Sequence, residues 1–133
     1  MAARIATGVS IVDAEAQGNT VTLAVRNSGE RRLTDFPSWD LIVHLHTAAG
    51  QYRVERLSHA DAAQTAEAWD VVGIYLDASA SEPEAYEPGI LNPGEVAVLR
   101  ASLETVLDED ATHLVVLGTP NGIARTRQFT GTP

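Results

Sequence analysis

Hydrophobic and polar residues alternate along much of the chain with the two-residue period of a β-strand. In residues 20–26, Val21, Leu23 and Val25 share one face, and small or polar residues occupy the other. Residues 95–103 repeat this pattern, with alanine or leucine at every second position. Further strands are predicted at residues 9–14, 39–47, 51–57, 69–76, 113–117 and 123–130. The run at 113–117 is apolar without interruption, which is typical of a central buried strand.

Turn signals separate these segments at regular intervals. They are Gly18-Asn19, Asn27-Ser28-Gly29, Ala49-Gly50, Pro88-Gly89, Pro93-Gly94 and Pro120-Asn121-Gly122. Proline presets the first turn position, and glycine supplies the positive φ that the next position often needs. About eight short strands with regular turns predict an all-β fold, an antiparallel β-sandwich, in a single domain spanning residues 1–133.

Two segments depart from simple alternation. Residues 58–68 are rich in alanine and begin with a Ser58-x-x-Asp61 helix-start signal, so either a short helix or a polar loop fits. In the last strand, Arg125 and Arg127 share the parity of Ile123 and Phe129. We expect a β-bulge there; the alternatives are pairing with carboxylates at a sheet edge, or contact with a partner.

Charge narrows the possible partners. The chain of 133 residues has a formal net charge of −9, and all nine of its basic residues are arginine. An acidic domain repels nucleic-acid phosphates and anionic lipid, so neither is an expected partner. No segment approaches the roughly 20 apolar residues of a membrane span, and no signal peptide is visible. The absence of cysteine excludes disulfides and thiol chemistry.

The sequence contains only weak candidates for metal-binding or catalytic sites. His44 and His46 could begin a metal site with His59 or His113, but their parity opposite Leu41, Val43 and Leu45 predicts that they face solvent. Asp108-Glu109-Asp110 lacks the alternating ligands and the glycine of a calcium loop. Motifs of nucleophilic catalysis and nucleotide binding are missing. We therefore expect no enzyme, no cofactor and no metal.

The two tryptophans, Trp39 and Trp69, each begin a predicted strand. An aromatic side chain at that position either caps the core at the end of the sandwich or offers a binding platform, and the first interpretation is favoured.

Three stretches together carry a family resemblance. They are Val25-Arg26-Asn27-Ser28-Gly29 with the following Leu33-Thr34-Asp35-Phe36 and Trp39-Asp40-Leu41-Ile42-Val43, then Gly89-Ile90-Leu91-Asn92-Pro93-Gly94-Glu95, then Thr119-Pro120-Asn121-Gly122-Ile123. From about Val9 to Phe129, the chain resembles the soluble domains of the archaellum accessory proteins called the F and G components (FlaF and FlaG). That resemblance implies an immunoglobulin-like β-sandwich outside the membrane and a non-enzymatic stator role. The N-terminal hydrophobic helix that anchors those proteins is not in this sequence, which is expected to be the soluble part of a longer, anchored protein.

The resemblance implies a location at the cell surface and contacts with the surface-layer (S-layer) protein of the envelope or with other archaellum components. Open edge strands also suggest a homodimer. The candidate contact residues are Phe36, Trp39, Tyr86, Ile90, Arg125 and Arg127. Two alternatives stay open: the outer domain of a filament subunit of the archaellin or pilin kind, and a cell-surface adhesion or carbohydrate-binding module of the CARDB type.

Overall fold

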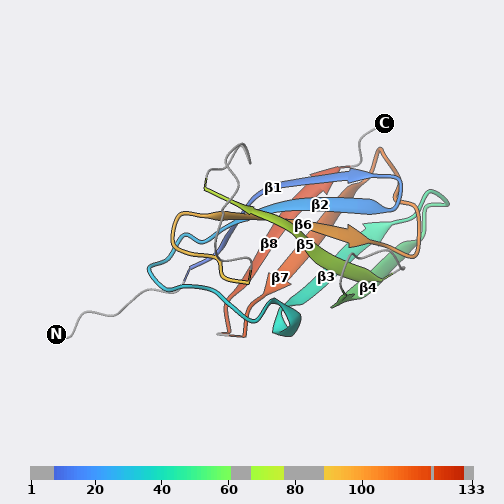
Figure 1. The fold of residues 1–133 in the computed structure, drawn as a ribbon. Coiled ribbons are helices and arrows are strands. Elements are labelled where there is room, and N and C mark those ends of the chain that lie inside the picture. Colours follow the sequence, from blue (N-terminus) through green and yellow to red (C-terminus); the bar gives the residue numbers. More distant parts are fainter. Residues whose placement is uncertain (1–7, 61–66, 77–88, 121, 131–133) are drawn as a thin grey trace.

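The structure is a computed structural model that describes residues 8–60, 67–76, 89–120 and 122–130. It contains eight strands and one short 3-10 helix, η1 (Phe36–Ser38) (Figure 1). The strands are β1 (Ser10–Gln17), β2 (Thr20–Arg26), β3 (Asp40–His46), β4 (Tyr52–His59), β5 (Ala68–Tyr75), β6 (Val96–Ser102), β7 (Thr112–Gly118) and β8 (Ala124–Thr130). All eight predicted strands are present, with small shifts at their ends.

The strands form two packed layers, which confirms the predicted β-sandwich. Their order is β1-β2-β6-β5-β4-β3-β7-β8, so that β1, β2, β6 and β5 make one layer and β4, β3, β7 and β8 the other (Figure 1). One pairing departs from the antiparallel expectation, because β4 and β5 run parallel where Ser58 and His59 meet Ala68 and Trp69. This short pairing joins the layers along one side.

The core lies between the layers and follows the predicted alternation. On β2, Val21, Leu23 and Val25 are fully buried, whereas Thr22 and Arg26 are exposed. The same alternation buries leucines on β3, β6 and β7. Because burying one such side chain contributes roughly 1.5–3 kcal/mol, these inward faces dominate the stability of the fold.

The turns behave as their residues predict in most places. Gly94 and Gly122 have φ angles of 86° and 85°, and Gly18 in the β1–β2 hairpin has 63°. The helix interpretation that starts at Ser58 is wrong at its first residues, because Ser58 and His59 complete β4. Residues 61–66 of that segment lie outside the described residues. Across the described ranges, the structure contains no helix long and apolar enough to cross a membrane.

Candidate protein-contact surface

Asn27 organises the end of the sandwich where β2 finishes. Its side chain is buried, and its Nδ2 donates to the carbonyl oxygens of Arg31 at 2.6 Å and Leu91 at 2.8 Å. Its Oδ1 accepts from the backbone N–H of Gly29 at 3.0 Å. Every hydrogen-bonding group of this amide is therefore used inside the protein.

The backbone of Asn27 joins the same end to the turn before β6. Its N–H donates to Glu95 at 3.0 Å, and its carbonyl accepts from Gly94 at 2.9 Å. Leu33 and Leu91 exchange backbone hydrogen bonds of 2.9 and 2.8 Å and are buried. Two of the three stretches that carry the family resemblance are thus one connected structural unit.

The aromatic residues of this end pack into the core. Phe36 and Trp39 have ring centroids 4.7 Å apart, and both are buried. The indole Nε1 of Trp39 donates to the carbonyl of Thr34 at 3.0 Å. This burial agrees with the core-capping interpretation, and a direct contact of these rings with a partner stays a prediction. Ile90 is half-buried, whereas Tyr86 lies outside the described residues.

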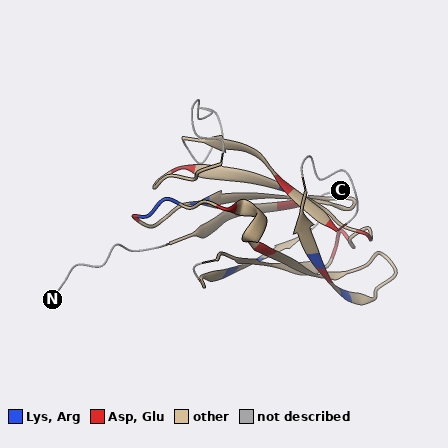
Figure 2. Cartoon of the chain, turned by 60° about the horizontal axis from the view of Figure 1, so that its bottom comes forward, with Lys and Arg blue, Asp and Glu red and all other residues tan. Residues whose placement is uncertain are grey.

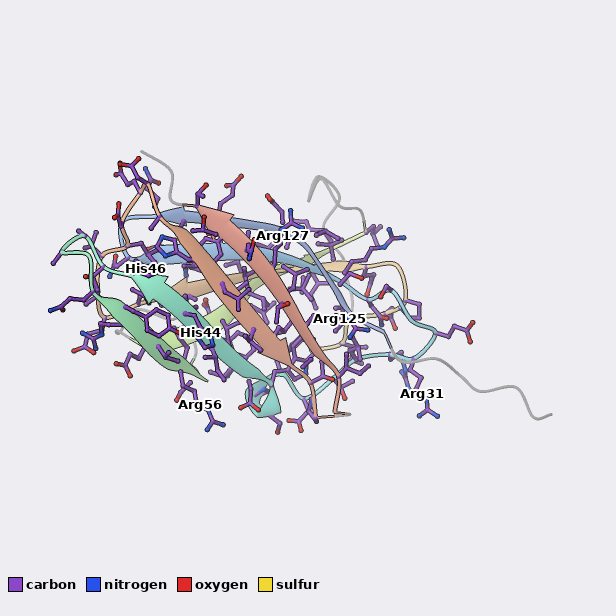
Figure 3. All side chains as sticks on the ribbon, turned by 180° about the vertical axis from the view of Figure 1, so that it is seen from behind. Arg31, His44, His46, Arg56, Arg125 and Arg127 are labelled. Carbon is purple, nitrogen blue, oxygen red and sulfur yellow. The ribbon has the colours of Figure 1, made fainter. Side chains whose placement is uncertain are left out.

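Arg125 and Arg127 close the side of the sandwich where β8 faces β1 (Figure 3). The Nε of Arg125 donates to the carbonyl of Val9 at 3.0 Å, and the Nη1 of Arg127 to that of Ile11 at 3.2 Å. The expected bulge in β8 is wrong, because its described pairing with β7 has no register shift. The parity conflict is resolved differently. Both side chains start on the inner face and extend to backbone carbonyls, that of Ile11 in the edge strand β1 and that of Val9 just before it.

The opposite side of the sandwich has an open edge along β4. In the described residues, β5 pairs with β4 only at Ser58 and His59, so residues 52–57 pair with β3 alone. The backbone N–H of Thr47 donates to the carbonyl of Gln51 at the turn into β4. In an antiparallel pair, every second residue bonds to the neighbouring strand, so this bond fixes which residues of β4 bond to β3. It follows that Tyr52, Val54 and Arg56 direct their backbone N–H and C=O groups away from β3.

The side chains at those positions are exposed on the outer face. Tyr52 and Val54 have 59% and 51% of their surface accessible. Arg56 points away from the layer and pairs with Asp40 at 2.7 Å (Figure 3). The hydroxyl of Tyr52 lies 2.6 Å from Nδ1 of His44. This edge therefore combines free backbone groups with two large exposed side chains.

The four histidines, all within the described ranges, form no metal-ligand cluster, although the rings of His46 and His113 have centroids 6.4 Å apart. His44 and His46 are half-buried on the outer face of β3, as their parity predicted. His113 is buried on the inner face, where its Nδ1 accepts from the backbone of His46 at 3.1 Å and its Nε2 donates to the carbonyl of Asp108 at 2.8 Å. His59 packs against Trp69 with ring centroids 4.9 Å apart. The structure does not bring a third of these four histidines into a site with His44 and His46.

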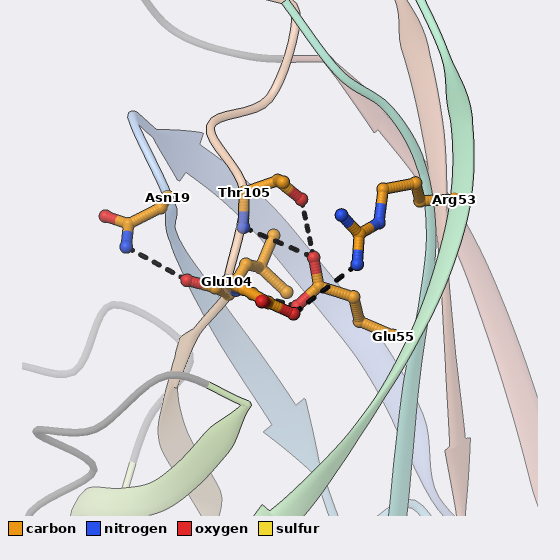
Figure 4. A network of polar contacts seen from close by, with 6 residues as sticks. Asn19, Arg53, Glu55, Glu104 and Thr105 are labelled. Carbon is orange, nitrogen blue, oxygen red and sulfur yellow. Dashed lines mark hydrogen bonds and ion pairs between the residues drawn. The ribbon is translucent and has the colours of Figure 1, made fainter.

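A cluster of three carboxylates, Glu55, Glu67 and Glu104, lies near the beginning of the β6–β7 connection. Figure 4 shows Glu55 and Glu104 of this cluster with their neighbours Arg53 and Thr105. Glu55 is buried, and its carboxylate accepts from the backbone N–H of Glu104 at 2.7 Å and from the hydroxyl of Thr105 at 2.6 Å. Arg53 forms an ion pair with Glu104 at 3.4 Å. These contacts make Glu55 an anchor that ties this connection to β4.

Crowding of these carboxylates changes the protonation of Glu67. A side-chain hydrogen bond with Glu104 raises the pKa of Glu67 above its ordinary value of 4.5, and desolvation and the charges of Glu104 and Glu55 add to the effect. The positive charge of Arg53 opposes it. Three neighbouring carboxylate groups could hold a cation, but the protein already supplies donors to the buried member.

Neither the position of the open edge on β4 nor the carboxylate cluster was predicted from the sequence. A signal for both was present in Tyr52-Arg53-Val54-Glu55-Arg56, where the apolar residues have the outward parity and two charged residues have the inward one. Inverted alternation of this kind indicates a strand whose inward charges find partners and whose outward face is unusually apolar.

Comparison with solved structures identifies similar folds. The archaellum periplasmic stator protein FlaG from Sulfolobus acidocaldarius matches with a TM-score of 0.68 and 19% identity, over 93% of this chain and 100% of that one. A chain of the FlaF–FlaG stator complex from the same organism matches with a TM-score of 0.68 and 18% identity, over 96% and 92%. The archaeal flagellin FlaB1 from Methanocaldococcus jannaschii matches with a TM-score of 0.64 and 15% identity, over 95% and 90%.

Sequence comparisons add no relative: no protein-family model matches the chain, and no curated protein matches it. The structural likeness covers nearly the whole described fold. The expected resemblance to archaellum stator proteins is thereby confirmed for the fold, which is the immunoglobulin-like β-sandwich.

Proposed function

We propose that the chain is a non-enzymatic structural component of an archaellum-type motility machine, acting by contacts with other proteins. The observation that carries the proposal is the match to the stator protein FlaG over 100% of its solved chain. It is supported by the way the polar groups are used, since Asn27, Glu55 and His113 all serve as structural anchors.

The proposed location is the outer surface of the cell, with membrane anchoring through an N-terminal helix in the native protein. The proposed partners are the surface-layer protein of the envelope and other archaellum components. A homodimer through an edge strand is proposed as well. One of the similar structures is a complex of two stator proteins, FlaF and FlaG, which supports contact between components of this kind.

The contact surface is proposed at the turn end of the sandwich and at the β1–β8 side. Ile90 is half-buried next to the buried Leu91, and Arg125 and Arg127 are exposed. Tyr86, Phe36 and Trp39 remain proposed members of this surface.

Binding of the purified domain to the purified surface-layer and archaellum accessory proteins of its own organism tests this function. Ile90→Asp should weaken binding by about tenfold, the usual cost of disturbing one apolar anchor in an interface. Val106→Asp is the matched control, because Val106 is exposed at the opposite end of the sandwich, next to the β3–β4 turn. Failure of the unmodified domain to bind any of these proteins contradicts the function.

A filament subunit is the second candidate, and the likeness to the flagellin FlaB1 favours it. A subunit would be recovered in sheared filaments in many copies, whereas a stator component would stay with the cell envelope. Quantitative mass spectrometry of sheared filaments and of envelopes distinguishes these outcomes. Binding to purified glycans with no protein partner would instead support the adhesion-module alternative.

A further inference from the structure

The two sides of the sandwich differ in how their edges are protected. On one side, Arg125 and Arg127 donate to the carbonyls of β1, which occupies part of that edge. On the other side, residues 52–57 of β4 have no backbone partner beyond β3 within the described ranges. An exposed edge of this length is a template for another strand unless charges or bulges block it.

The β4 edge carries three charged residues, Arg53, Glu55 and Arg56, but it has no bulge and no proline. Its pairing with β3 is regular, without a register shift. Val54, at the middle of the open stretch, is uncharged and half exposed, and Tyr52 beside it is also exposed. The outer face of β3 and β7 continues the apolar surface with half-buried Ile42, Leu114 and Val116.

The residues of this edge are complementary to themselves in one antiparallel register. When Val54 lies opposite Val54 of a second copy, Tyr52 lies opposite Arg56, and Arg53 lies opposite Glu55. An arginine over a tyrosine ring is attractive. Arg53 opposite Glu55 avoids like-charge repulsion between the strands, with the Glu55 carboxylate itself held by hydrogen bonds from Glu104 and Thr105. The two-fold axis makes each of these pairs occur twice.

Other antiparallel registers also let the outward backbone groups of Tyr52, Val54 and Arg56 bond to the second copy, but they are less favourable. Centring the pair on Arg53 or Arg56 places like charges opposite each other, and centring it on Glu55 does the same with carboxylates. Centring it on Tyr52 brings in Gly50 of the β3–β4 turn and leaves Arg56 without a cross-strand partner. Charge complementarity therefore selects the Val54 register.

We propose that the β4 edge binds the β4 edge of a second copy of this chain, antiparallel and centred on Val54. This deepens the homodimer within the proposed function by naming the strand, the register and the residues. The β4–β3–β7–β8 layer then continues across the two-fold axis as one sheet, with the β1–β8 side and the turn end left free for other partners.

Cysteine cross-linking tests the register directly, because the chain contains no cysteine. Opposite residues that exchange hydrogen bonds have Cα atoms about 5.5 Å apart, a separation that a disulfide spans. Val54→Cys should form a disulfide-linked dimer about tenfold faster than Thr126→Cys, because self-pairing raises the effective concentration of the first thiol only. Thr126 is an exposed outer-face residue of β8, the strand at the far end of the same layer.

Sedimentation equilibrium of the cysteine-free protein provides a second measurement. The unmodified domain should show a monomer–dimer equilibrium, and Val54→Lys should weaken dimerisation at least about tenfold by placing two ammonium groups at the two-fold axis. Val106→Lys, on the exposed connection between β6 and β7, should leave the equilibrium unchanged.

Three outcomes overturn the proposal: a monomer at all concentrations, a dimer that Val54→Lys leaves intact, and equal cross-linking of the two cysteine variants. If the edge instead bound a strand of another protein, this chain would be monomeric in sedimentation equilibrium, and Val54→Lys would abolish its binding to that protein. None of these outcomes bears on binding at Ile90, so the proposed function is tested separately.

Discussion

Asn27 uses both amide hydrogens and its carbonyl oxygen to hold two turns together while buried at 1% exposure. Removing such a side chain costs more than its hydrogen bonds, because the carbonyl of Leu91 loses a donor at a buried position. The Asn-x-Gly turn at Asn27 therefore has a structural role, because its asparagine side chain holds neighbouring segments together, and no catalytic role is needed to explain it.

Asn27→Ala should therefore lower the free energy of unfolding by about 2–4 kcal/mol, measured by chemical denaturation. Asn19→Ala is the control, since the exposed Asn19 donates one hydrogen bond to Leu103 and should cost about 1 kcal/mol or less. Equal costs for the two variants would show that Asn27 does not organise this end of the sandwich.

Glu67 supplies a pH dependence whose sign follows from its raised pKa. The folded protein holds this proton more tightly than the unfolded chain, so the contribution is fully present below the ordinary pKa of 4.5 and is lost as the pH rises through the folded pKa. Glu67→Gln keeps a hydrogen-bond donor toward Glu104 without the charge.

We expect Glu67→Gln to be more stable than the unmodified protein near neutral pH, and the difference to shrink as the pH falls toward 4.5. Thermal unfolding between acidic and neutral pH measures this difference. Glu109→Gln removes the same charge from an exposed connection and serves as the control. A difference that grows toward acid pH would contradict the assignment.

Among the elements, β8 shows how an edge is protected without a bulge. Arg125 and Arg127 have the inward parity, yet their guanidinium groups are long enough to leave the core and donate to β1. Arginine can do this because its several donors sit at the end of a flexible apolar stem.

Replacing both arginines by alanine should expose the edge of β1 to solvent and make local opening easier. We expect the amides of β1 to exchange hydrogen faster by about one order of magnitude, while the exchange of β3 and β7 stays unchanged. The control replaces Thr126 and Gln128, which are exposed on the outward parity of β8, by alanine. Equal exchange in β1 of the two double variants would show that the arginines do not seal this side.

The elements also show which structural features a sequence can predict. All eight strands could be found, because most carry a two-residue period, the one at 113–117 is an apolar run, and turn residues separate most of them. The parallel meeting of β4 with β5 and the role of Glu55 could not, because they depend on residues distant in sequence that only the packed layers bring together. Of the contact candidates, Trp39 was predictable as a core cap, whereas the open edge at Val54 became visible only once the strand order was known.

At the scale of the whole molecule, the fold carries a strongly acidic surface. The formal net charge is −9, and Figure 2 shows acidic residues on both layers rather than in one patch. At the β4 edge the charges are balanced locally, because Arg53 pairs with Glu104 and Arg56 with Asp40. Self-association therefore combines local attraction at β4 with a long-range repulsion between two acidic bodies.

Salt should strengthen the β4–β4 dimer for this reason. The repulsion acts over distances that salt screens, since the Debye length falls from about 30 Å at 0.01 M to about 10 Å at 0.1 M. The Tyr52–Arg56 and Val54–Val54 contacts act at short range and are partly removed from water, so they are screened less. Sedimentation equilibrium at about 0.02 M and about 0.3 M sodium chloride should give a dissociation constant several-fold lower at the higher concentration. Val54→Lys should remain largely monomeric at both concentrations, and a dimer that weakens with added salt would mean that attraction between charges, rather than the apolar edge, holds the two copies together.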